Sequence, residues 1–204
     1  MVSLLLPIIY IAFISLGLPD SLLGSAWPTM YPELGVPVSC AGILSMIISL
    51  DTILSSLQSD RLTRTLGTGR VTAISVGMTA AALFGFSIST QFWMLCLWAV
   101  PYGLGAGSVD AALNNYVALH YKSRHMSWLH CMWGIGTMIS PMVMGRVLAG
   151  GGPWTSGYRC IALFQILLSA VLFISLPLWQ SRTAGTDAEA ASPQVLSLGQ
   201  VFRL

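Results

Sequence analysis

Two aspartates lie inside long apolar runs of this sequence, where water is scarce. Asp20 occurs in GLPDSLLG (17–24) and Asp110 in GSVDAALN (107–114), so both fit the pattern Gly-x-x-Asp-x-x-Leu. A carboxylate in the middle of a membrane helix costs about 2.5–3.5 kcal/mol on insertion scales, and such residues usually face a bundle interior or a water-filled cavity. The chemistry expected here is proton exchange and contact with a polar solute. The alternative is that each aspartate caps or cross-links a neighbouring helix.

Small and polar residues share the helix face of the second aspartate. Gly103, Gly107, Asp110 and Asn114 follow one another at three or four positions, which places them on one stripe of a helix. Such a face can approach a neighbouring helix closely and can form hydrogen bonds with a polar guest. Asn114 is therefore preferred as a solute contact over Asn115, which lies roughly 140° around the helix from Asp110.

Three residues with rings complete the expected solute-binding set. Tyr102 and Trp133 can stack on a ring of the solute, although most tryptophans in a membrane chain serve packing or anchoring at the interface. His130 lies about one turn into the fifth apolar segment, and a buried, hydrogen-bonded histidine is the alternative to a solute contact. Together with Asn114 and Asn115, these residues are the candidate solute contacts.

Composition places all of these residues in a membrane protein. The chain has 204 residues, of which 55% are hydrophobic and 8% charged, whereas a soluble domain carries about 25% charged residues. Six apolar runs are long enough to cross a hydrocarbon core of about 30 Å. We expect one domain over residues 1–180, followed by a polar cytoplasmic linker over 181–204. Its helices are expected near 4–27, 39–58, 70–89, 92–118, 127–149 and 158–179.

Several function classes are disfavoured by what the sequence lacks. It has no basic patch of the kind that binds nucleic acid, and its four cysteines show no metal-ligand spacing. His120, His125 and His130 are five residues apart, which spreads them around a helix instead of gathering them on a metal. GLGAGS lacks the third glycine of a dinucleotide fingerprint and follows no strand. The Gly-x-Gly-Asp sequence of intramembrane aspartyl proteases is also missing. We therefore expect neither an enzyme nor a cofactor.

The distribution of Lys and Arg predicts the orientation in the membrane. If the helices alternate in direction, six basic residues lie on one side and only Arg146 and Arg159 on the other. Because basic residues are concentrated in cytoplasmic loops, the first side is the cytoplasm. We expect a multi-pass protein of the cell membrane with both termini in the cytoplasm. The six residues on the basic side are Arg61, Arg64, Arg70, Lys122, Arg124 and Arg182.

The two aspartate motifs indicate an internal repeat. The first apolar segment runs outward and the fourth runs inward, and each carries its aspartate about two-thirds of the way along. Inverted repeats of three helices are a hallmark of transporter folds, in which the solute binds at the interface between repeats. The expected fold is an all-α integral membrane bundle of six transmembrane helices, built as a 3+3 inverted repeat.

Several stretches resemble the major facilitator superfamily. LQSDRLTRTLGTGR (57–70) resembles the family's signature between helices 2 and 3, in which an Asp-Arg pair is followed by further basic residues. The resemblance implies that Asp60 and Arg61, with Arg64 in the same motif, form a latch at the cytoplasmic gate. Ser56 stands where this motif usually has glycine, which bears on how tightly the second helix packs.

Three longer stretches are similar to the fucose permease-like branch of that family, the sugar:proton symporters. They are GLPDSLLGSAWP, GLGAGSVDAALNNYVALHY and MSWLHCMWGIGTMISP. In that branch an acidic residue on helix 1 and another on helix 4 serve proton coupling and sugar binding. The resemblance implies these roles for Asp20 and Asp110.

The resemblance further implies one half of a twelve-helix fold, because the chain covers the first six helices and LSLGQVFRL resembles the lead-in to an absent seventh. The expected function is secondary active transport of a small polar solute, most simply a sugar, by proton-coupled alternating access. Protonation of Asp20 and Asp110 would allow the loaded carrier to close without burying a charge. The expected partners are membrane lipid, the solute, protons, and a second six-helix half or a second copy. The alternative is a non-transporting half that acts only as an assembly partner.

The predicted orientation can be tested by cysteine labelling. In a variant without native cysteines, Gly152→Cys should react with a membrane-impermeant maleimide in intact cells, because it lies on the side poor in basic residues. Leu66→Cys should react only after the membrane is permeabilised. The opposite pattern would show that the orientation is reversed.

Overall fold

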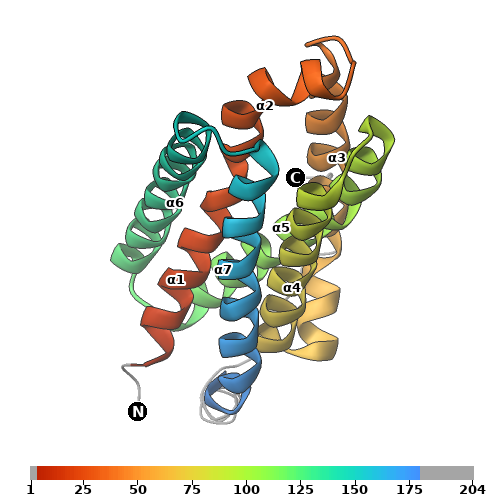
Figure 1. Ribbon diagram of the computed structural model, residues 1–204. Helices are drawn as coiled ribbons and strands as arrows, with labels where there is room; N and C mark the ends of the chain where they lie inside the picture. The colour runs from red at the N-terminus through yellow and green to blue at the C-terminus, as the bar shows by residue number, and fades with distance from the viewer. Residues whose placement is uncertain (1–3, 180–204) are drawn as a thin grey trace.

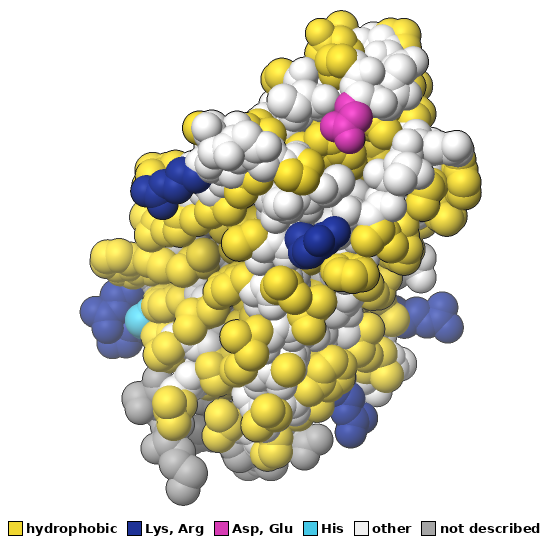
Figure 2. Space-filling view, viewed as in Figure 1, with side chains coloured by type: hydrophobic (Ala, Val, Ile, Leu, Met, Phe, Trp, Pro, Cys, Tyr) yellow, Lys and Arg dark blue, Asp and Glu magenta, His cyan; other side chains and the backbone are white. Residues whose placement is uncertain are grey.

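The computed structural model describes residues 4–179 and consists of helices packed side by side, without a strand among those residues (Figure 1). Because α1 and α2 form one apolar span, the helices provide six stretches long and apolar enough to cross a membrane. The face formed by α4 and α7 carries mostly hydrophobic side chains (Figure 2). The predicted all-α fold of six spans is confirmed. The helices are α1 (Leu5–Asp20), α2 (Leu22–Glu33), α3 (Cys40–Leu66), α4 (Thr68–Ile88), α5 (Phe92–His120), α6 (Ser123–Ala149) and α7 (Trp154–Ile174).

The first span is interrupted at Ser21, directly after Asp20. Pro19 has no backbone N–H, so the carbonyl of Ser15 loses its helical hydrogen bond. The Nε2 of Gln165 on α7 donates to this carbonyl oxygen at 2.6 Å. A buried amide from another helix thus satisfies the acceptor that the proline leaves free, and the helix can break beside the aspartate without leaving that carbonyl unpaired.

The second span is longer than predicted. α3 continues to Leu66, whereas the sequence predicted that this helix ends near residue 58, so the prediction of a loop is wrong for residues 59–66. Asp60, Arg61 and Arg64 lie in the last turns of this helix. Only Gly67 separates α3 from α4, and its positive φ of 82° is a conformation that glycine adopts without strain. The charges predicted a loop, but a helix can extend beyond the apolar core, where exposed basic side chains are hydrated.

The first span, predicted to end near residue 27, runs to Glu33, and each end of the remaining spans lies within five residues of its predicted place. α6 begins at Ser123 rather than near 127, and α7 runs from Trp154 to Ile174 rather than over 158–179. The segment predicted as a linker, 181–204, lies outside the described residues.

Two close helix crossings build the bundle around the aspartate motifs. α1 packs on α6, and α5 packs on α3. A side chain at Gly17 would collide with the carbonyl oxygen of Trp133, and one at Gly107 would collide with that of Thr52. These glycines are the first residues of the two Gly-x-x-Asp motifs. The two crossings therefore relate the first span to the fifth and the fourth to the second, as an inverted repeat requires.

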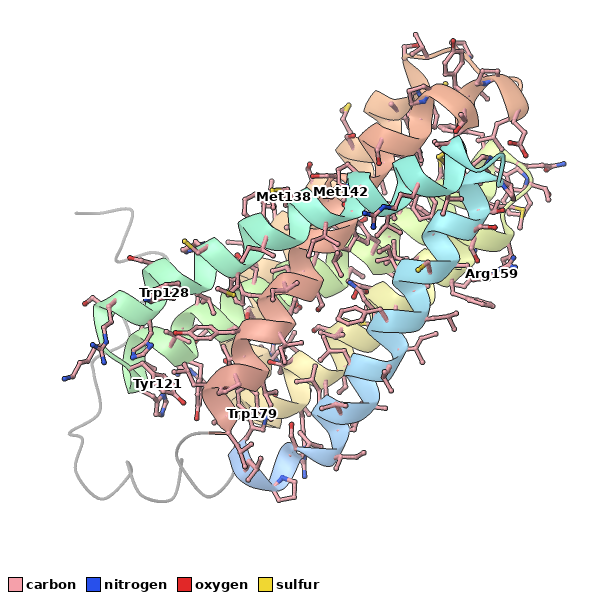
Figure 3. The ribbon with its side chains drawn as sticks, turned by 60° about the vertical axis from the view of Figure 1, so that its left-hand side comes forward. Tyr121, Trp128, Met138, Met142, Arg159 and Trp179 are labelled. Atoms are coloured by element: carbon pink, nitrogen blue, oxygen red, sulfur yellow. The ribbon has the colours of Figure 1, made fainter. Side chains whose placement is uncertain are left out.

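α3 and α6 lie at opposite sides of the bundle (Figure 1) and are its least buried helices. Only 11% and 17% of their most apolar stretches are buried, against 44–67% in the other spans. On α6, Trp128, Met138 and Met142 project away from the bundle (Figure 3), and each is more than half exposed. The apolar core is thus formed mainly by α1, α4, α5 and α7.

The α1–α6 crossing predicts a sharp difference between two glycines of α6. A side chain at Gly136 would meet the backbone of Ile14, whereas nothing lies within 4 Å of one at Gly134. Gly136→Ala should lower the free energy of unfolding by about 1–3 kcal/mol, because backbone cannot yield as a flexible side chain does. Gly134→Ala is the matched control and should be neutral or slightly stabilising. Denaturant unfolding in micelles measures both, and equal effects would contradict the close crossing.

Candidate functional site

A cavity of about 330 Å³ lies between α1, α3, α5 and α6, and we name it the central cavity. Each aspartate motif contributes its carboxylate, Thr52 and His130 are also polar, and the other lining side chains are apolar or aromatic. Five of the predicted site residues therefore come together, although they are up to 113 positions apart in the sequence. Its lining residues are Leu16, Asp20, Ile48, Thr52, Tyr102, Ala106, Asp110, His130 and Trp133.

Both carboxylate oxygens of Asp20 accept hydrogen bonds from aromatic side chains. The hydroxyl of Tyr102 on α5 donates to Oδ1 at 2.9 Å, and Nε1 of Trp133 on α6 donates to Oδ2 at 2.8 Å. Hydrogen bonds to a charged acceptor are stronger than neutral ones. Asp20 thus links three helices. Tyr102 and Trp133, which the sequence suggested as solute contacts, hold the carboxylate in place and also form part of the cavity wall.

Asp110 accepts fewer hydrogen bonds from the protein than Asp20 does. Its Oδ1 accepts one hydrogen bond, from Nδ2 of Asn114 at 3.0 Å, and among the described residues it accepts no other. Asn114 lies one helical turn further along α5 and does not line the central cavity. Its Oδ1 is buried without a partner among residues 4–179. Asp110 therefore retains acceptor capacity that faces the cavity.

His130 lines the central cavity from α6. Its ring meets the edge of Phe13, with the centroids 6.1 Å apart and the planes at 84°. The imidazole is exposed and is the one basic side chain that lines the central cavity. It can therefore form hydrogen bonds with a solute in the cavity.

The remaining predicted site residues lie elsewhere. Asn115 is exposed and lines no part of the central cavity. Asp60 and Arg64 form an ion pair at 3.1 Å, one turn apart on the end of α3, with both side chains more than half exposed. Such an exposed pair contributes little to stability. Arg61 is exposed beside them. Within residues 4–179 no three His, Cys, Asp or Glu side chains gather as a metal site would need.

A row of hydrogen bonds between α3 and α5, which begins at Thr52 in the cavity wall, was not predicted from the sequence. Hydroxyl groups of α3 donate to backbone carbonyls of α5: Thr52 to Gly103, Ser55 to Leu104 and Ser56 to Gly107. Ser55 also bonds the hydroxyl of Ser108. The spacing of Thr52, Ser55 and Ser56 by three and four positions places them on one helix face, and that periodicity could have revealed them. The serine at position 56 therefore joins the α3–α5 contact instead of weakening it.

A family model described as Major Facilitator Superfamily matches residues 9–203 of this chain. The matched range includes every residue that lines the central cavity. No curated protein matches the chain.

The link between Tyr102 and Asp20 predicts an energetic coupling. Tyr102→Phe should lower the free energy of unfolding by about 1.5–3 kcal/mol, the range for a hydrogen bond to a charged group. The same substitution should cost clearly less in an Asp20→Leu background, where the acceptor is gone. Unfolding in mixed micelles measures this double-mutant cycle. Tyr31→Phe, outside the cavity, is the control and should cost the same in both backgrounds; equal costs for Tyr102→Phe would refute the coupling.

Proposed function

Because this chain belongs to the major facilitator superfamily, we propose that it forms the cavity-bearing half of a proton-coupled carrier for a small polar solute, with a sugar as the favoured class. Members of this family are membrane transporters, not enzymes. The observation that carries the proposal is that Asp20 and Asp110, from equivalent positions of the two repeats, line one cavity inside the bundle.

The chemistry of the cavity supports a sugar. A sugar presents many hydroxyl groups and at least one apolar face. The free acceptor capacity of Asp110 suits a hydroxyl donor, and His130 offers a second polar contact from α6. The indole of Trp133 is 39% exposed, so its ring is accessible to an apolar face of the solute. The similarity of residues 17–28, 103–121 and 126–141 to the fucose permease-like branch favours the same class.

The difference in hydrogen bonding between Asp20 and Asp110 supports separate roles for the two carboxylates. Asp20 has both oxygens occupied by Tyr102 and Trp133 and so suits a fixed acceptor. Asp110 has one hydrogen bond and faces the cavity, so it suits a group that gains and loses a proton. Protonation removes a charge that would otherwise be enclosed when the cavity closes, and an enclosed charge is costly in a membrane.

The bundle also needs a partner that closes the open side of the central cavity. Two carboxylates cannot face hydrocarbon, and the helices on either side of the cavity, α3 and α6, are the least buried. We assign the missing wall to a second six-helix bundle, from a partner half or a second copy of this chain. The same exposed helices support the other candidate function, a half that only assembles with a partner and transports nothing.

Transport measurements test the role of Asp110. In membrane vesicles that hold this chain and a second six-helix bundle of the family, D-galactose should cause proton uptake and accumulate. Asp110→Asn keeps the size and the hydrogen bond to Asn114 but removes the proton site, so accumulation should fall at least ten-fold while insertion persists. Asp51→Asn is the matched control, since Asp51 lies in the span of α3 but does not line the cavity, and it should transport normally.

The outcomes separate the two candidate functions. Normal proton coupling in Asp110→Asn would reduce Asp110 to a packing residue and refute the mechanism. Stable pairing with a second bundle, without uptake of any sugar tested, would favour the assembly partner. The chain alone should not accumulate sugar, because one wall of its cavity is missing.

A further inference from the structure

A groove of about 270 Å³ lies between α3 and α4, and we name it the α3–α4 groove. Both helices pack closely on α5 but touch each other at few positions, so α5 forms the floor of the groove and the other two helices form its walls. Most of its lining is apolar. The apolar lining residues are Leu62, Leu66, Val71, Ile74, Met78 and Leu104.

The groove opens on the side of α5 that faces away from the central cavity. Leu104 and Ser108 of α5 line the groove, whereas Ala106 and Asp110 line the central cavity. The two sets are offset by two residues, which is about 200° around a helix of 3.6 residues per turn. A second bundle that closes the central cavity therefore leaves the groove uncovered, and the groove faces the lipid.

The groove is accessible from the membrane and presents little unpaired polarity. Leu66 is 41% exposed and Ile74 is 42% exposed, so both walls can be reached from outside. The hydroxyl groups of Ser55 and Ser108 on its inner side bond each other. A surface of this kind suits a hydrocarbon chain, because an unfilled groove would lose the dispersion contacts that a chain lying in it makes.

A basic side chain stands at the end of the groove where α3 joins α4. Arg70, Ile74 and Met78 follow one another at intervals of four residues, so Arg70 extends the α4 wall by one turn. Its side chain is exposed, and within residues 4–179 no salt bridge joins it to an acidic residue. The first turn of α4 has neither a side-chain cap nor an acidic residue, so the positive end of its helix dipole adds to this charge.

An apolar groove with a cation at one end matches the two parts of an anionic phospholipid. Soluble phosphate esters share the anionic group, but only the lipid brings a hydrocarbon chain that fills the groove. Basic pockets between transmembrane helices on the cytoplasmic side are known to bind anionic headgroups. The orientation predicted from the sequence places the α3–α4 junction on that side.

We propose that the α3–α4 groove binds one anionic phospholipid of the bilayer, with an acyl chain along the groove and the phosphate on Arg70. The long arginine side chain can lie along apolar surface and still place its guanidinium group at the level of the headgroups. The proposal needs neither a solute nor a proton, so it stands apart from the proposed function.

The test is native mass spectrometry of the full chain in detergent micelles, titrated with dioleoyl phosphatidylglycerol or dioleoyl phosphatidylcholine. Wild type should bind the first phosphatidylglycerol about five-fold more tightly than phosphatidylcholine, the factor that one basic residue near an anionic headgroup provides. Arg70→Gln should abolish this preference and leave the binding of phosphatidylcholine unchanged. Arg159→Gln is the matched control, because Arg159 is an exposed arginine on α7 that lines no part of the groove, and it should keep the preference (Figure 3).

A second pair of variants tests the groove itself. Ile74→Trp places a larger side chain in the groove and should weaken the binding of both lipids about three-fold or more, because the acyl chain loses its contacts. Ile166→Trp is its control at a similarly exposed position of α7, 45% exposed, and should bind as wild type does.

Each outcome decides the proposal. Equal affinity of wild type for the two lipids, or an unchanged preference in Arg70→Gln, overturns it. Competition by sn-glycerol 3-phosphate as strong as that by phosphatidylglycerol would show an anion site that does not use the groove, and also overturns it. So does a dimer of the chain that excludes the lipid, because a second copy would then occupy this face. Circular dichroism of each variant shows that a loss of binding is not a loss of fold. Since no measurement here involves sugar or proton uptake, failure of the lipid site leaves the proposed function standing.

Discussion

The arrangement of this bundle depends on two helix crossings, α1 with α6 and α3 with α5, at which a helix backbone packs directly against glycine. The carbonyl oxygens of Trp133 and Thr52 occupy the space that a side chain at Gly17 or Gly107 would need. Only glycine permits this approach, and the aspartate three residues later then lies beside the helix that has come so close. The Gly-x-x-Asp motif thus joins two functions in one turn: its glycine brings the neighbouring helix in, and its carboxylate forms the wall of the cavity between them.

The aspartates of the two repeats have different hydrogen-bond partners, although both follow a close-packed glycine. In the first repeat, Asp20 is fastened to two other helices through Tyr102 and Trp133. In the second, Asp110 has a local partner, Asn114, on its own helix. Equivalent positions of an inverted repeat have therefore diverged, and the cavity is asymmetric although the helices around it are related. Because of this asymmetry, Asp20 fixes the positions of neighbouring side chains, whereas Asp110 keeps acceptor capacity that faces the cavity.

The sequence predicted the six spans and the equivalent places of the two aspartates along their helices, because hydropathy and short motifs can be recognised directly in the residues. It did not predict that Tyr102 and Trp133 bond Asp20, since contacts over 82 and 113 positions depend on how whole helices pack. It also placed Asp60 and Arg64 in a loop, because charge was taken to end the helix. The hydrated end of α3 instead continues as helix beyond its apolar part. Asn114 was correctly placed on the face of Asp110, but periodicity cannot show that its amide turns toward the carboxylate.

The interruption of the first span at Ser21 has a mechanical consequence. A 2.8 Å hydrogen bond between Tyr10 and His125 joins α1 to α6. At the far end of the span, Nε1 of Trp154 on α7 donates to Glu33 of α2 at 2.7 Å. A tilt of α2 relative to α1 turns about the break between them. Asp20 lies next to that break, and residues beside a hinge are displaced less than the far ends of the two helices that it joins. The carboxylate can therefore keep its place while the ends of the span change their angle.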